Sequence, residues 1–302
     1  MVPRNTKARR IPRNDGKVES LDHSSLSIIQ QACLIMLAPA FVAVYGPTIG
    51  WLWQKWTTGW SFHQVHGLAV PFAVAFLIWR KMIAYNWSRR AEEGSALGFL
   101  FLIPSLAIHV LDTSLWFQTP SALSIVPTLI GLSLLFLGRL RTLHILFPLL
   151  LLFFMVPLPS AITQPIFPLL RKISAFGTEE VLSGVGVSFF RSETIFEFVN
   201  GSVNIDDPCS GQNTIMATLA FTCVVLSLRP TGLLQSLLLV AFALPVAICA
   251  NIFRISILSL LVAYLGTAPL HNFLHPLSGY LGFFIAVAAQ LSLFKLLKRG
   301  KA

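Results

Sequence analysis

Long apolar runs without an ionised side chain are the feature that most restricts how this chain can fold. Residues 145–156, 233–250 and 255–265 contain no Asp, Glu, Lys or Arg. Only 11% of the 302 residues are charged, against roughly 25% in an average soluble domain. Because such runs cannot all be hidden from water in one soluble core, we predict an all-α polytopic membrane protein.

The apolar runs also predict how many helices cross the membrane. A helix of about 20 residues spans the roughly 30 Å of hydrocarbon in a bilayer. About eight transmembrane helices are predicted, over residues 28–53, 62–79, 96–113, 122–138, 143–157, 210–228, 233–254 and 276–296. We therefore expect a basic tail over residues 1–27 and a single transmembrane domain over residues 28–302.

Lysine and arginine give the expected orientation, because basic residues favour the cytoplasmic side. Basic residues cluster at positions 4–17, 80–90, 139–141, 229 and 295–301. With eight spans, all these clusters fall on the cytoplasmic side together with both termini, although Lys55, Arg171 and Lys172 are exceptions on the outer side. The net charge of +10 forms no basic stripe with interleaved aromatic residues, so no nucleic-acid partner is expected.

The longest outer segment, residues 158–209, is predicted to carry two small elements between spans five and six. Residues 161–182 place apolar side chains at helical spacing, which predicts an amphipathic helix on the bilayer surface. Those side chains are Ile162, Ile166, Leu169, Leu170 and Ile173. Residues 187–205 are rich in strand-forming residues around Asn200-Gly201 and predict a short β-hairpin.

Three polar residues interrupt the second half of the chain at predicted span boundaries: Cys209, Arg254 and His275. From residue 233, a helix rises about 32 Å before it reaches Arg254, which places Arg254 at the outer membrane boundary. Cys209 and His275 each precede a span that starts on the same side. The three residues are therefore expected at one depth on the outer face, and a thiol, a guanidinium and an imidazole together are typical of a cysteine protease-like site.

The surroundings of Cys209 favour a reactive thiol over a small packing residue. Asp207 suits a helix N-cap and Pro208 the first helical position, so Cys209 is expected in the first turn, where the helix dipole favours a thiolate. The negative charge of neighbouring aspartates opposes this effect. Gln212 and Asn213 then lie on the same helical face and are available to orient a partner or to stabilise an oxyanion.

Arg254 and His275 each have a simpler interpretation as well. A single arginine at the end of a span often extends its charge to lipid head groups. Because residues 255–265 remain apolar after it, we expect Arg254 to be flanked by protein and to be functional. His271 lies in the same outer loop and competes with His275 for the catalytic assignment.

Two further pairs of polar residues contain histidine. His63 and His66 are three residues apart, as metal ligands can be, but no third ligand accompanies them, and neither a metal nor a cofactor is expected. His109 and Asp112 share one helical face and are interpreted as a satisfied polar pair.

Several motifs around these residues occur in a fixed order. They are Cys209-Ser210-Gly211, Asn251 with Arg254, His275 with Gly279, and upstream His66-Gly67 and the segment 154–159. In this order, over about residues 45–297, the chain resembles the exosortase/archaeosortase family of membrane-embedded cysteine transpeptidases. Pro208 before the cysteine and Gln212-Asn213 after the glycine depart from the usual family pattern, which leaves the subfamily and its cognate sorting signal open.

The resemblance implies an enzyme of the bacterial inner membrane, with its active site on the extracytoplasmic face. Its substrates would be exported, membrane-anchored proteins whose C-terminal sorting signal consists of a short motif, a transmembrane helix and a basic tail. Cys209 would be the nucleophile, His275 the acid or base and Arg254 the oxyanion stabiliser. Supporting or substrate-binding roles would fall to Ser210, Gly211, Gln212, Asn213, Asn251 and His66.

Two other functions remain as alternatives. A non-catalytic transporter or assembly factor for surface polysaccharide export would use Arg254 to bind an anionic group, without need of the thiol. A transferase of lipid-linked intermediates would need a carboxylate cluster or a metal site. Asp206 and Asp207 form a predicted outer carboxylate pair, and no further acidic ligands surround it.

Overall fold

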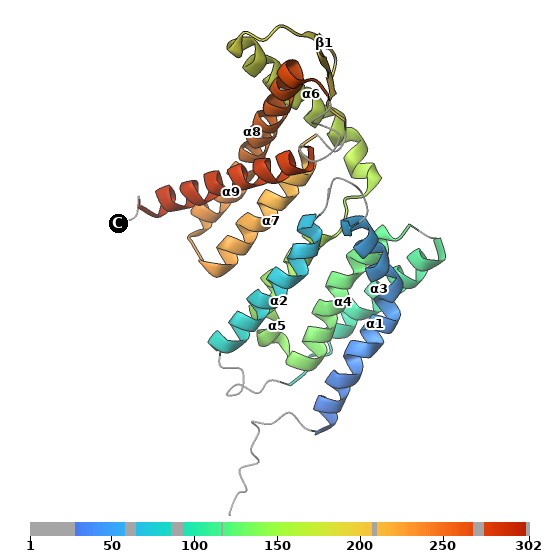
Figure 1. Cartoon of the computed structure of the whole chain (residues 1–302). Helices are drawn as coiled ribbons and strands as arrows, with labels where there is room; N and C mark the ends of the chain where they lie inside the picture. Colours follow the sequence, from blue (N-terminus) through green and yellow to red (C-terminus); the bar gives the residue numbers. More distant parts are fainter. Residues whose placement is uncertain are drawn as a thin grey trace, which may run out of the picture.

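The computed structural model describes residues 28–57, 65–85, 93–115, 117–206, 210–267 and 275–299, and it shows an all-α membrane protein with one small sheet (Figure 1). The helices are α1 (Ile28–Thr57), α2 (Val65–Tyr85), α3 (Gly98–Leu115), α4 (Thr119–Leu137), α5 (Arg139–Leu151), a 3₁₀ turn η2 (Leu152–Met155), α6 (Ser160–Val185), α7 (Gln212–Leu228), α8 (Leu233–Leu265) and α9 (His275–Arg299). The strands are β1 (Phe190–Ser192), β2 (Ile195–Phe198) and β3 (Gly201–Asn204).

Six helices in the described part of the chain are long and apolar enough to cross a membrane: α1, α2, α3, α4, α8 and α9. The predicted all-α, polytopic class is therefore confirmed. Each of the eight predicted spans has a helix in its place, but two of these helices are short. With 13 and 17 residues, α5 and α7 fall below the length of the other six, so the count of eight spans stays a prediction.

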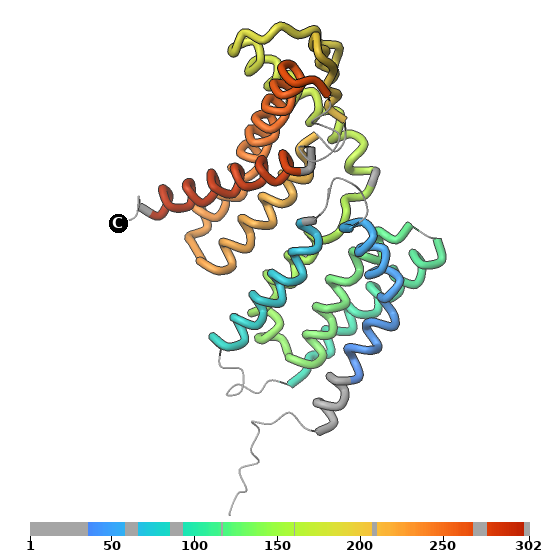
Figure 2. Tube along the Cα trace, viewed as in Figure 1, coloured from blue at the N-terminus to red at the C-terminus, as the bar shows by residue number. Residues whose placement is uncertain are grey.

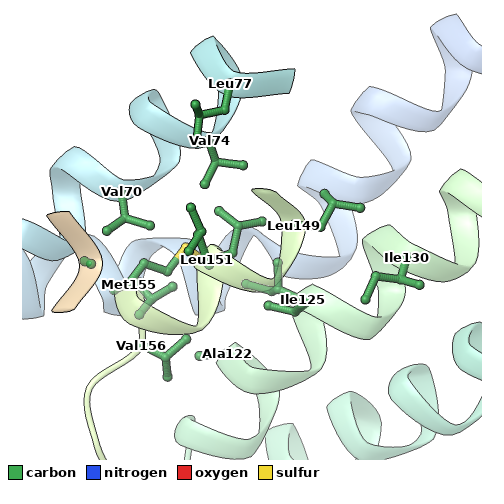
Figure 3. Close-up of a cluster of buried hydrophobic side chains, with 14 of the residues drawn as sticks. Val70, Val74, Leu77, Ala122, Ile125, Ile130, Leu149, Leu151, Met155 and Val156 are labelled. Atoms are coloured by element: carbon green, nitrogen blue, oxygen red, sulfur yellow. The ribbon is translucent and has the colours of Figure 1, made fainter. Parts of the chain in front are cut away.

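Helices α1 to α5 form one packed group with the larger hydrophobic core. α3 and α4 approach closely where Gly98 meets Gly131, since a Cβ at either glycine would lie within 3 Å of the other's carbonyl oxygen. Close contact through small residues is a common way to pack membrane helices. The core beside this pair joins α2, α4, α5 and η2 (Figure 3), and includes Val70, Val74, Ile125, Leu149 and Met155.

Helices α7, α8 and α9 form a second group, drawn in orange to red in the Cα trace (Figure 2). The two groups are joined because α7 packs against α2 and α5. On α9 the buried residues recur every fourth position, which is one face of a helix. They are Ser278, Gly282, Ala286, Gln290 and Phe294. Gln290 Nε2 donates to Thr222 Oγ1 of α7 and to the Leu239 carbonyl of α8, and so ties the three helices together.

Helix α6 has one exposed apolar face and one face packed on protein, in line with the predicted amphipathic helix. Ile162, Ile166 and Leu169 are exposed, while the opposite face packs on α8. Gly186 ends α6 in a left-handed conformation (φ 79°), and the Val187 amide donates to the Leu182 carbonyl. This is the Schellman pattern that commonly ends helices at glycine.

The predicted hairpin is present but belongs to a three-stranded antiparallel sheet of order β1-β2-β3. Phe198 pairs with Gly201, so the turn between β2 and β3 consists of Val199 and Asn200, one residue earlier than predicted. The additional strand β1 was not predicted, because three residues are too few to show an alternating pattern. Phe196 of β2 packs with Leu182 of α6 in a small separate core.

Helix α8 extends well beyond the predicted span. Its 33 residues correspond to about 50 Å at 1.5 Å per residue, which exceeds the roughly 30 Å of hydrocarbon. Beyond Arg254, α8 packs against α6 and the sheet: Ile255 joins the small core, and Asn200 Nδ2 donates to the Ala263 carbonyl over 2.7 Å. The apolar run 255–265 therefore serves a protein contact and is not a further span.

Candidate active site

Arg254 lies inside the protein, on the face of α8 that packs against α9. Its side chain is only 6% exposed, and Nε donates a hydrogen bond of 3.0 Å to Ser278 Oγ. Gly282 follows one turn after Ser278 and lies beside the Arg254 stem, since a Cβ there would be 3.7 Å from both Cβ and Cδ of the arginine, an ordinary contact distance. The expectation that Arg254 is flanked by protein is confirmed.

Asn251 precedes Arg254 by one turn and joins α8 to α6. It is 1% exposed, and its Nδ2 donates to Ser174 Oγ over 3.0 Å. The chain just after Cys209 touches the same side chain, because a Cβ at Gly211 would lie 2.8 Å from Cγ and from Nδ2 of Asn251. Asn251 therefore links α6, α8 and the segment that leads into α7.

The segment before α7 has a different conformation from the predicted one. Gly211 is the N-cap of α7 in a left-handed conformation (φ 89°, ψ −2°), and the helix begins at Gln212. The prediction that a helix starts at Pro208 and holds Cys209 in its first turn is therefore wrong. Gly211, in its left-handed conformation, packs against Asn251, and α7 therefore does not extend back toward Cys209. Cys209 itself lies outside the described residues, and Ser210 beside it is buried.

Gln212 and Asn213 are the first two residues of α7 and are half-buried. The argument that put them on one helical face with Cys209 no longer applies, because Cys209 precedes the helix. They lie at the start of α7, beside the Gly211–Asn251 contact, and their supporting role stays a prediction.

His275 is the first residue of α9. Ser278, the partner of Arg254, follows three residues later and lies on the same side of the helix. The side chain of His275 and the whole of His271 fall outside the described residues, so the choice between these histidines stays a prediction. The start of α9 is nevertheless joined directly to Arg254 through Ser278.

His66 stands in the first turn of α2 and is half-buried. Beside it, Gly67 lies so close to Trp56 that a Cβ would approach Nε1 to 2.4 Å, and Trp56 Nε1 donates to the Met155 carbonyl over 3.0 Å. The two upstream motifs thus meet at one end of the first group, and α2 packs on α7. His63 falls outside the described residues, and the described residues hold no group of three or more metal-binding side chains.

A second buried polar group lies among α1, α3 and α4, and we call it the α3–α4 cluster. Its members are Tyr45, Thr48, Ser105, His109, Asp112, Ser121, Ser124 and Thr128. His109 and Asp112 do not bond to each other as a pair but meet at Ser121: His109 Nδ1 lies 2.6 Å from Ser121 Oγ, and the Ser121 amide donates to Asp112 Oδ2 over 2.8 Å. Asp112 thereby caps the N-terminus of α4 from the neighbouring helix.

Ser174 and Ser278 were not identified as site residues from the sequence. Ser174 belongs to a run of small residues on α6, with Gly177 packed against Ile252 of α8. Such a run of small residues is typical of a helix contact, so it was a usable signal. For Ser278, the sequence offered only its place within the His275–Gly279 motif.

The arrangement is chemically suited to stabilising a developing negative charge. The Arg254 guanidinium is buried in a site that excludes much of the water, and its Nε donates to the Ser278 hydroxyl. Fixed donors in such an environment stabilise an oxyanion more strongly than donors in bulk water do. We call this set, Arg254 with Ser174, Gly211, Asn251 and Ser278, the Arg254 cluster.

Comparison with known proteins identifies the family of this chain. The family model of the transmembrane exosortases matches residues 53–291, which include every member of the Arg254 cluster. No curated protein and no solved structure matches the chain. Because the family match covers most of the chain, this protein belongs to the transmembrane exosortase family of membrane-embedded sorting enzymes.

Proposed function

We propose that this protein is an intramembrane cysteine transpeptidase or endopeptidase. It cleaves exported proteins at a C-terminal sorting signal made of a short motif, a transmembrane helix and a basic tail, and transfers the product to an acceptor. One observation carries the proposal: three motif segments that are distant in sequence converge on Arg254. Gly211 contacts Asn251 one turn away, and Ser278 of the His275 motif bonds to the guanidinium.

In the proposed reaction, the Cys209 thiolate attacks the scissile carbonyl carbon, and the carbonyl oxygen becomes an oxyanion. Arg254 stabilises that oxyanion, and its hydrogen bond to Ser278 keeps the guanidinium in a fixed plane. The C–N bond then breaks, His275 protonates the leaving amine, and an acyl-enzyme remains. His275 next takes a proton from the acceptor, which attacks the thioester and releases Cys209.

The proposed orientation puts this chemistry at the extracytoplasmic surface of the bacterial inner membrane, with both termini in the cytoplasm. The basic loops support it by the positive-inside rule. The length of α8 supports it too, because about 32 Å separates its start near Arg229 from Arg254. An exported substrate held by its own transmembrane helix would present its signal motif at this level.

The experiment is co-expression with a secreted reporter that ends in a sorting signal from the source cell. Cleavage is followed on immunoblots with Cys209→Ala, Arg254→Ala and His275→Ala, and each variant is expected to lose it. Cys249→Ala is the matched control, because Cys249 is an exposed cysteine on α8, and it should cleave normally.

His271→Ala, compared with His275→Ala, decides which histidine acts. Undiminished cleavage by Cys209→Ala would rule out a cysteine mechanism and leave a binding or transport role.

A further inference from the structure

A cavity of about 600 Å³ lies between the C-terminal ends of α7 and α9. Its size falls in the range of small-molecule sites, roughly 300–1,000 Å³. Because α7 begins at Gln212 and α9 at His275, this cavity lies at the opposite ends of both helices from the Arg254 cluster. It is lined by Val225, Leu228, Arg229, Leu291, Phe294, Lys295 and Lys298.

The lining combines an apolar part with three cations. Phe294 is buried, whereas Arg229, Lys295 and Lys298 are exposed. Lys295 and Lys298 are three residues apart on α9 and therefore share a face, with Arg229 opposite them at the end of α7. No carboxylate lines the cavity, and the sequence has no Asp or Glu after Asp207.

At each of the two helix ends, one backbone carbonyl is bonded to a group other than these three cationic side chains. The carbonyl of Leu297 accepts a hydrogen bond of 2.8 Å from Gln235 Nε2 of α8. The carbonyl of Val225 accepts from the backbone amide of Arg229 over 2.9 Å. Three positive charges thus gather at a half-apolar cavity at the end of two apolar helices, and a ligand that complements them carries negative charge and hydrocarbon together.

We propose that this cavity binds an anionic phospholipid. Its phosphate lies between Arg229, Lys295 and Lys298, and an acyl chain lies along Val225, Leu228 and Leu291. Basic pockets between transmembrane helices are suited to such head groups. A zwitterionic lipid fits less well, because its ammonium group is repelled by the same three cations. The bound lipid would hold together the ends of α7 and α9, whose other ends carry the candidate active site.

The test is native mass spectrometry of the purified full-length protein in detergent, with phosphatidylglycerol or phosphatidylcholine added in turn. Wild type should retain phosphatidylglycerol in preference to phosphatidylcholine. The triple variant Arg229→Ala/Lys295→Ala/Lys298→Ala should lose about tenfold or more of that retention, since each basic residue contributes to anionic lipid binding. The matched control, Arg80→Ala/Arg139→Ala/Lys172→Ala, removes three exposed cations elsewhere and should bind as wild type does.

Two further binding measurements distinguish a phospholipid from other ligands. Inorganic phosphate should not displace the lipid, and diacylglycerol, which lacks a phosphate, should not be retained. Leu291→Trp, at the partly exposed rim of the cavity, should block retention without changing charge, and it replaces the triple variant if that protein does not fold. Equal loss in the control variant, equal retention of both phospholipids, or displacement by inorganic phosphate would overturn the proposal.

Discussion

The α3–α4 cluster and the Arg254 cluster are both buried among membrane helices, but they are built from different groups. In the α3–α4 cluster, hydroxyls bond to one another and to His109, and the Ser121 backbone amide donates to Asp112. Tyr45 Oη, for example, lies 2.7 Å from Thr128 Oγ1 and 3.0 Å from Ser124 Oγ. The Arg254 cluster instead places a guanidinium against a serine hydroxyl, where three motif segments meet.

This difference suggests different roles. A network of mutually bonded side chains within one helix group fixes how the helices pack, and its loss lowers the stability of the fold. A buried arginine is costly to maintain inside a membrane protein and by default marks a functional site. Substitutions in the Arg254 cluster should therefore reduce activity more than stability, and substitutions in the α3–α4 cluster the reverse.

Arg254→Lys should give the largest effect and test the comparison most directly. Lysine keeps the charge but cannot reproduce the planar donor set that a guanidinium offers to an oxyanion and to Ser278. We expect the cleavage rate of the co-expressed reporter to fall about 10²- to 10³-fold, with little change in the melting temperature in detergent. A large fall in melting temperature with normal specific activity would reverse the roles assigned to the two clusters.

Gly211→Ala should give the second largest effect. A Cβ at this position would lie 2.8 Å from Asn251 atoms, and the left-handed backbone adds about 1–2 kcal/mol of strain. A displacement of the segment next to Cys209 should lower reporter cleavage by about 10²-fold. Gly184→Ala on α6 is the matched control, because nothing lies within 4 Å of its Cβ position; activity should be retained there.

Asp112→Ala tests the role of the α3–α4 cluster. The Ser121 amide at the start of α4 would lose its acceptor, which should cost about 1–3 kcal/mol of stability. Thermal unfolding in detergent should show a lower melting temperature, while cleavage per folded molecule stays normal. Asp112→Asn keeps an acceptor oxygen and should recover much of the loss; a large drop in specific activity for Asp112→Ala would assign this cluster a catalytic role.

Ser278→Ala should give the smallest of the four effects. It removes one hydrogen bond to a charged group, worth about 1.5 kcal/mol, and so should slow cleavage about tenfold. Ser292→Ala on the same helix is the control, since that exposed hydroxyl bonds only to the Ala288 carbonyl of its own helix. If both variants cleave at the wild-type rate, Ser278 does not position Arg254.

Much of the helix pattern was predictable, because apolar length alone separates membrane helices from loops. The helix boundaries near the candidate active site were less predictable. Asp207 and Pro208 are good helix-start residues, yet α7 begins at Gln212, since Gly211 packs against Asn251 in a left-handed conformation. That contact joins residues forty positions apart, and local sequence preference contains no information about it.

The sequence by itself determined that this is a multi-pass helical membrane protein, and its ordered motifs indicated the family. It also indicated that Arg254 would be enclosed, because apolar residues continue beyond it. Only the tertiary structure decided what encloses it: α9 supplies Ser278, while α6 supplies Ser174 to the neighbouring Asn251. The physical reason is that periodicity reports which residues avoid water, whereas hydrogen-bond partners depend on which helices meet and at what register.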